Sequence, residues 1–179
     1  MPETVLEVQY IQKLKVLFTL TIAGELQSWD MAEYFSRNSK TNEKKGILNF
    51  RMIHIEKIPG YNEKLFKDCT SFLWIDYEQI LLVAHKDFSI YNFALNSVME
   101  FYPKMVLHGH MAFVKKIRYS DRTKYVYSVA INNVINVWNP FVKKPIATIN
   151  AFTDTEKIVV DIYIPEKNNV IVGVTDSYS

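Results

Sequence analysis

The sequence predicts an all-β fold in which small groups of short antiparallel strands recur along the chain. Aromatic residues are abundant, with 11 tyrosines and 11 phenylalanines, and such side chains favour strands. Only 5 glycines are present, which argues against glycine-rich phosphate loops. The apolar stretches are short and are bounded by turn residues, and few long patterns with a helical period compete with them.

Ten strands are expected. Within each group, tight turns such as Ala23-Gly24 and the segment 165–169 (PEKNN) join consecutive strands. Alternation of apolar and polar residues gives their bounds. In chain order they are Val16–Thr21, Glu25–Trp29, Ser71–Asp76, Ile80–Ala84, Phe88–Phe93, Val114–Tyr119, Tyr125–Ala130, Val134–Trp138, Ile158–Ile164 and Val170–Thr175.

The strand groups repeat. Trp138 superposes on Trp29 without gaps, and the same frame puts Tyr91 in the corresponding place of the middle group. The last group fits at a shift of 45, with Val172–Val174 over Tyr127–Val129. The predicted organisation is one domain over 1–179 with units 1–35, 47–100, 101–148 and 149–179. A polar insert loop over 36–46 lengthens the first interval.

The frame formed by Gly109-His110 and Trp138-Asn139 resembles the WD-repeat family of β-propellers, whose repeats span about 40–45 residues. The resemblance implies a hydrogen-bonding network inside each unit between a histidine, a turn acid or amide, a hydroxyl residue and the closing tryptophan. Carried onto this sequence, the network residues are His110, Asn132, Trp138, Trp29, Thr21 and Tyr91. Ala130 stands where the hydroxyl is usual and Ala23 where the acid is usual, so the network is expected to be weakened.

The fold class expected from this resemblance is a partial WD-repeat propeller of about four blades, the last of them incomplete. A closed propeller needs roughly 4–8 four-stranded blades, which stack face to face. An open arc would leave two apolar faces in water. We therefore expect the chain to be a fragment of a longer protein, or to be covered by partner chains.

The second half is similar to WD-repeat proteins of cilia and flagella, through Val137–Pro140, Phe141-Val142, Pro145-Ile146 and Ile164-Pro165. The resemblance implies a cytoplasmic, non-enzymatic scaffold on axonemal microtubules. Its partners would be other proteins of a large assembly, tubulin among them. The basic residues of the insert, Lys40, Lys44 and Lys45, are candidate partner contacts, although a solvated loop explains them too. The alternative is a cytosolic or nuclear WD-repeat adaptor in an unrelated assembly.

Nothing in the sequence points to catalysis, a cofactor or a metal ion. His108 and His110 alternate on a strand-like stretch and so point to opposite sides, and Asp154 to Glu156 lack the ligand spacing of a calcium loop. A net charge of +2 gives no reason to expect nucleic acid as a partner. No apolar run approaches the roughly 20 residues that cross a bilayer. The lone cysteine, Cys69, is expected to be buried and structural.

Overall fold

The computed structural model contains only antiparallel β-sheets in the residues that it describes, which are 4–31, 51–53, 67–95, 101–151, 157–165 and 171–177. The chain divides into two compact units, Met1–Lys67 and Asp68–Ser179. The first holds one four-stranded sheet with the order β1-β2-β3-β4. Its strands are β1 (Val5–Ile11), β2 (Val16–Thr21), β3 (Leu26–Asp30) and β4 (Arg51–Ile53).

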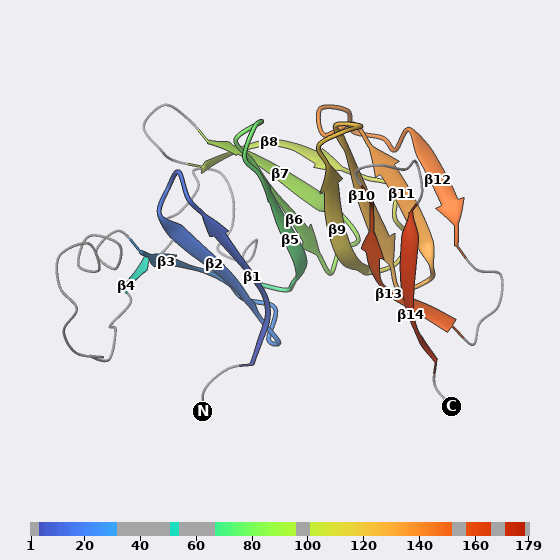
Figure 1. Cartoon of the computed structure of the whole chain (residues 1–179), viewed down its shortest axis with the longest axis horizontal. Helices are drawn as coiled ribbons and strands as arrows, with labels where there is room; N and C mark the ends of the chain where they lie inside the picture. The colour runs from blue at the N-terminus through green and yellow to red at the C-terminus, as the bar shows by residue number, and fades with distance from the viewer. Residues whose placement is uncertain are drawn as a thin grey trace. The chain divides into compact units, whose positions relative to one another are not determined.

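The second unit holds two further four-stranded sheets and one two-stranded sheet (Figure 1). Strands follow one another in each sheet as they do in the chain. The second sheet has β5 (Cys69–Ile75), β6 (Ile80–His85), β7 (Ile90–Leu95) and β8 (Phe101–Leu107). The third has β9 (Val114–Ser120), β10 (Tyr125–Ala130), β11 (Val134–Trp138) and β12 (Ala147–Asn150), and the fourth has β13 (Lys157–Tyr163) and β14 (Val172–Ser177).

The all-β prediction is confirmed, and so are the bounds of several strands, including those of β2, β10 and β11. The outermost strands, β4, β8 and β12, were not anticipated. Every residue of β12 is exposed, so its sequence carries no apolar alternation. The burial of β8 does alternate at its start, but Pro103 argues against a strand there. Arg51–Ile53 and Phe101–Leu107 complete the preceding sheets by pairing with β3 and β7. The sequence had assigned both segments to the following unit.

One backbone irregularity recurs in all four sheets. The first strand of each carries a β-bulge at Leu6, Thr70, Lys115 and Val160, between the shifted registers of that strand and its partner. The intervals are 64, 45 and 45 residues (70 − 6, 115 − 70 and 160 − 115). A bulge bends its strand and increases the local twist, so each sheet is deformed at the same place.

The tight turns recur at the same intervals of 64 and 45 residues. Left-handed backbone occurs at Lys15, Gln79 and Lys124 before the second strands, with φ of 54°, 53° and 58°. It occurs again at Gly24, Phe88 and Asn133 before the third strands, with φ of 82°, 70° and 61°. The predicted shift of 45 for the last group is confirmed, because Gly173 pairs with Ile162 as Ser128 pairs with Ile117.

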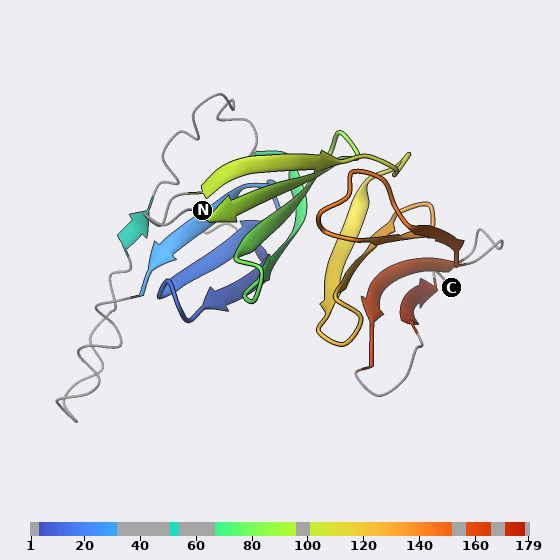
Figure 2. The ribbon, with the colours of Figure 1, turned by 90° about the horizontal axis from the view of Figure 1, so that it is seen from above.

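Within the second unit the sheets pack face to face (Figure 2). One face of the second sheet, including Leu82 and Ile90, packs on Val114, Ile117 and Trp138 of the third sheet. The other face of the third sheet packs on Val159 and Ile162 of the fourth sheet; its residues are Tyr127, Val129, Ile135 and Val137. In the second unit we call the face turned toward the following sheet the front and the opposite one the back. In the other sheets the two names are assigned by equivalent repeat positions alone. Cys69 lies buried on β5, as expected.

Candidate functional site

The Gly-His and Trp-Asn-Pro segments meet in a buried cluster of the third sheet. Trp138 Nε1 donates to Ser128 Oγ at 2.8 Å, and His110 Nε2 lies 2.6 Å from the same oxygen. All three residues are buried, and the imidazole lies beside the indole with ring centroids 5.9 Å apart. The hydroxyl therefore joins β10 to β11 and to the loop that precedes β9.

Burial lowers the pKa of His110 to about 4, so its imidazole is neutral near pH 7. An indole N–H can only donate, which makes Ser128 Oγ the acceptor from Trp138. The serine hydroxyl can then donate its own proton to the unprotonated Nε2 of His110. A neutral histidine thus accepts this bond without burying a charge, while its Nδ1 is buried and has no hydrogen-bond partner among the described residues.

Gly109 and the residues after Trp138 hold the loop against this cluster. A Cβ on Gly109 would lie 2.8 Å from Pro145 Cδ and 3.1 Å from Trp138 Cη2, so no larger residue fits without displacement. Asn139 Oδ1 accepts the N–H of Phe141 at 2.9 Å, and the Pro140 carbonyl accepts Nδ2 of Asn92 at 2.8 Å. The motif therefore also ties the third sheet to the second.

The hydroxyl predicted for the network is two residues away from its expected place. Ser128, not the position of Ala130, meets the tryptophan, and in the first sheet Trp29 Nε1 donates to Thr19 Oγ1 at 2.9 Å rather than to Thr21. Successive strand residues point to opposite faces, so only every second residue of β2 or β10 lies on the tryptophan's face. On each strand, two positions on that face could bond to the tryptophan. The cross-strand register determines which of them the indole N–H reaches.

The alignment that placed Tyr91 over Trp29 and Trp138 is wrong. Trp29 pairs with Leu17, Trp138 with Val126, and Phe93 with Leu81, so Phe93 occupies the tryptophan position of the second sheet. A three-residue turn sets the register of each hairpin, and the middle turn contains a bulky Phe88 at its left-handed position. Because Phe88 is neither glycine nor asparagine, the sequence contains no marker for that register.

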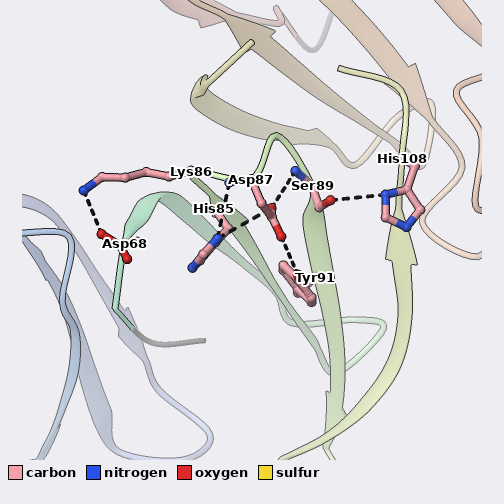
Figure 3. A network of polar contacts seen from close by, with 7 residues as sticks. All are labelled: Asp68, His85, Lys86, Asp87, Ser89, Tyr91 and His108. Carbon is pink, nitrogen blue, oxygen red and sulfur yellow. Dashed lines mark hydrogen bonds and ion pairs between the residues drawn. The ribbon is translucent and has the colours of Figure 1, made fainter. Parts of the chain in front are cut away.

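Tyr91 instead belongs to a polar network at the turn between β6 and β7 (Figure 3). Its hydroxyl donates to Asp87 Oδ2 at 2.6 Å, and Asp87 Oδ1 accepts the Ser89 N–H at 2.9 Å. His85 Nδ1 lies 3.5 Å from Asp87 Oδ1, and Ser89 Oγ lies 3.1 Å from His108 Nδ1. Lys86 Nζ pairs with Asp68 Oδ1 at 2.8 Å at the edge of the network.

Asp87 is ionised in this network. Burial raises the pKa of Asp87, but the hydrogen bonds from Tyr91 and Ser89 and the neighbouring His85 outweigh it, and the net pKa lies below the usual value. Asn132 takes the corresponding place in the third sheet, where its Oδ1 accepts the Val134 N–H at 3.4 Å. The turn acid or amide thus stabilises its own turn in both sheets.

An exposed aromatic pair lies at the same end of these sheets. The rings of Phe88 and Phe113 meet edge-on with centroids 5.2 Å apart, and the two side chains are 38% and 40% exposed. Ile131, also exposed, donates its N–H to the Phe113 carbonyl. We call Phe88, Phe113 and Ile131 the aromatic patch. Sequence reasoning missed it, because Phe88 was assigned to a strand.

Phe88 has a φ of 70°, at the position that Gly24 and Asn133 fill in the other two hairpins. Left-handed backbone costs about 1 kcal/mol or more for an L-residue with a bulky side chain. Such strain in a half-exposed residue is typical of positions kept for contact rather than for stability. Phe88 is therefore the functional candidate that the local geometry favours.

Lys40, Lys44 and Lys45 lie outside the described residues. Across the described ranges, no three His, Cys, Asp or Glu side chains gather as a metal site requires. In the same part of the chain, no helix has the length and apolar character needed to span a membrane.

Comparison with known proteins gives a likeness in fold only. No protein-family model matches the chain, and no curated protein matches it. Among solved structures, it is similar to the computationally designed Ika8 protein, with a TM-score of 0.62 and 12% sequence identity. The likeness covers 96% of this chain and 42% of that one, so this chain spans about two fifths of the length of the designed protein.

Proposed function

We propose that the chain is an arc of a WD-repeat-type β-propeller that acts as a non-enzymatic scaffold for protein contacts on ciliary or flagellar axonemal microtubules. The carrying observation is the recurrence of one bulged antiparallel hairpin in every sheet at intervals of 64, 45 and 45 residues. The tryptophan-to-hydroxyl contact, repeated by Trp29 with Thr19 and Trp138 with Ser128, supports the same reading.

A scaffold role is supported by the structural hydrogen bonds that the buried and turn polar groups make. His110 and Ser128 bridge strands, while Asp87, Tyr91 and Ser89 fasten a turn. The hydrogen bonds that these groups make hold the hairpins in register. The sheets in turn present their connecting loops as fixed surfaces for another protein.

The aromatic patch is the proposed contact surface. Exposed aromatic side chains are enriched where proteins bind one another, and Phe88 keeps its place there despite an unfavourable backbone conformation. Phe113 and Ile131 come from the neighbouring sheet, so the patch draws on loops that the sheet packing fixes in the second unit. The axonemal assignment rests on the resemblance of Val137–Pro140 and the segments after it.

The test is fractionation of ciliated cells that express a tagged copy of the chain. After detergent extraction, the proposal expects the chain to sediment with the axonemes, and the Phe88→Gly variant to move to the soluble fraction. Phe88→Gly relieves the left-handed backbone but also removes the contact with Phe113, so circular dichroism and urea denaturation check that the variant stays folded.

Lys15→Gly is the matched control, because it relieves the same backbone conformation in the first sheet and leaves the patch intact. Lys15→Gly should stay folded and stay with the axonemes. Release of the unmodified chain with the soluble cytoplasm would contradict the axonemal assignment and favour the adaptor reading. Equal sedimentation of Phe88→Gly and the unmodified chain would remove the patch as the contact surface.

A further inference from the structure

The first and fourth sheets expose apolar positions whose equivalents in the third sheet are buried. On the back of the first sheet, Val5 and Val8 are 47% and 59% exposed. The residues at the same repeat positions of the third sheet, Val114 and Ile117, are fully buried against the second sheet. Bulge and register define this equivalence, because Val5 precedes its bulge as Val114 does, and Val8 pairs with Thr19 as Ile117 pairs with Ser128.

The front of the fourth sheet shows the same contrast. Val172 and Val174 are 44% and 51% exposed. Their equivalents in the third sheet, Tyr127 and Val129, are 8% and 0% exposed because the fourth sheet covers them. Tyr163, which pairs with Val172 on this face, is exposed as well.

These two surfaces are complementary in kind. Inside the second unit, the front of one sheet packs on the back of the next, first from the second sheet to the third and then from the third to the fourth. A free front and a free back therefore belong to one type of interface, which is already formed twice. We call the back of the first sheet the head, defined by Val5 and Val8, and the front of the fourth sheet the tail, defined by Val172, Val174 and Tyr163.

We propose that a second copy of this chain covers these surfaces, with the tail of one copy packed on the head of the other. The proposal deepens the proposed function and rests on its repeat architecture. Head-to-tail contacts join unlike surfaces and so give a closed ring or an open series.

The chemistry of both surfaces fits this occupant. Aliphatic side chains on a β-sheet bury most area against another sheet with the same alternation, at a spacing of about 10 Å. Each half-exposed valine that becomes buried contributes through the hydrophobic effect, about 25 cal/mol for each Å² removed from water. The neighbouring interface at Val159 and Ile162 shows that this repeat forms such a contact with fully buried side chains.

The test measures the mass of the purified full chain by size-exclusion chromatography with light scattering. The unmodified chain should be a dimer or a larger head-to-tail series. Val8→Asp in the head and Val174→Asp in the tail should each reduce it to smaller species. An equimolar mixture of the two variants should give a 1:1 heterodimer, because one intact tail and one intact head remain between them.

Ile22→Asp and Met111→Asp are the matched controls, since both place a carboxylate at an exposed apolar position outside the head and tail. They should leave the mass unchanged. Circular dichroism checks that every variant keeps its strands, and a disulfide formed in trans between Val8→Cys and Val174→Cys chains gives a second readout.

A monomeric unmodified chain at the highest concentration that stays in solution would overturn the proposal. So would assembly that Val8→Asp abolishes and Val174→Asp leaves intact, since that pattern marks two heads packed on each other. The measurement uses no axonemes. A dimer that stays in the soluble cytoplasm would therefore contradict the axonemal function alone, and an axoneme-bound monomer would contradict this inference alone.

Discussion

Asn133 Oδ1 accepts the backbone N–H of Val159 at 2.8 Å, and this bond joins the turn before β11 to the first strand of the next sheet. Both residues are buried. Asn133 is also the left-handed residue of its turn, with a φ of 61°. One asparagine thus shapes a hairpin and fastens the neighbouring sheet to it.

Two substitutions at this position separate its two roles. Asn133→Gly loses the bond to Val159 but keeps the backbone relaxed, whereas Asn133→Ala loses the bond and adds left-handed strain. We expect Asn133→Ala to lower the free energy of unfolding by about 1–2 kcal/mol more than Asn133→Gly does. Urea denaturation of the two variants measures the difference, and equal stabilities would show that the turn adapts to alanine.

Removing the shared hydroxyl of the buried cluster tests its importance. Ser128→Ala leaves the buried Trp138 indole N–H without its acceptor and His110 Nε2 without its partner, which should destabilise the chain by about 2–3 kcal/mol. Thr19→Ala is the matched control in the first sheet, where the Trp29 indole is partly exposed and can turn to water. A loss as large in Thr19→Ala as in Ser128→Ala would contradict the role given to burial.

The neutral state of His110 predicts how stability depends on pH. Unfolding exposes an imidazole of ordinary pKa near 6.5, whereas the folded pKa is about 4. The unfolded chain therefore binds the proton first as the pH falls. The stabilisation is complete above pH 6.5, is lost between 6.5 and 4, and amounts to about 3 kcal/mol.

Denaturation curves over this pH range measure the effect. In His110→Gln, the free energy of unfolding should depend less on pH between 6.5 and 4. The variant should also be less stable near pH 7. The other histidines remain as they were in both proteins, so the difference between the two profiles isolates this residue. Parallel profiles for the two proteins would contradict the low pKa.

The ion pair between the third and fourth sheets should contribute little. Arg118 donates to Asp161 Oδ2 at 2.6 Å, but both side chains are about one third exposed, at 35% and 36%. A double-mutant cycle with Arg118→Ala and Asp161→Ala should give a coupling of about 1 kcal/mol or less, and molar salt should reduce it. A coupling of several kcal/mol would mean that water is excluded from the pair.

The sequence predicted most inner strands because their environment fixes their pattern. It missed β1, whose residues are mostly exposed or partly exposed. Ile80 to Ala84 lie in a strand buried on both faces and read as one apolar run. In β9 the buried residues Val114, Ile117 and Ser120 are separated by pairs of partly buried residues.

The outermost strands could not be found in this way. All residues of β12 are exposed, and Pro103 argues against a strand in β8. Arg51 of β4 pairs with Asp30, which lies 21 residues earlier in the chain (51 − 30).

The candidate site was predicted in part. The meeting of His110 with Trp138 followed from the motif, and the structure places both in one cluster. Ser128 was missed because the hydroxyl was expected at the position of Ala130. Phe93 was missed because Phe88 is not a typical turn residue, so the turn that sets the register of Phe93 could not be recognised. Which of two alternating residues faces a partner depends on register, and three-dimensional pairing settles it.

The unequal spacing of the repeats has a practical consequence. Met31 and Leu95 donate to equivalent carbonyls, those of Lys15 and Gln79, so the hairpins before them superpose residue for residue. The 19 residues by which the first interval exceeds the others (64 − 45) must then fall between Met31 and Asp68. The repeat therefore tolerates additional residues between these two positions. An epitope, a fluorescent reporter or a protease site inserted there should leave the hairpins before and after it unchanged.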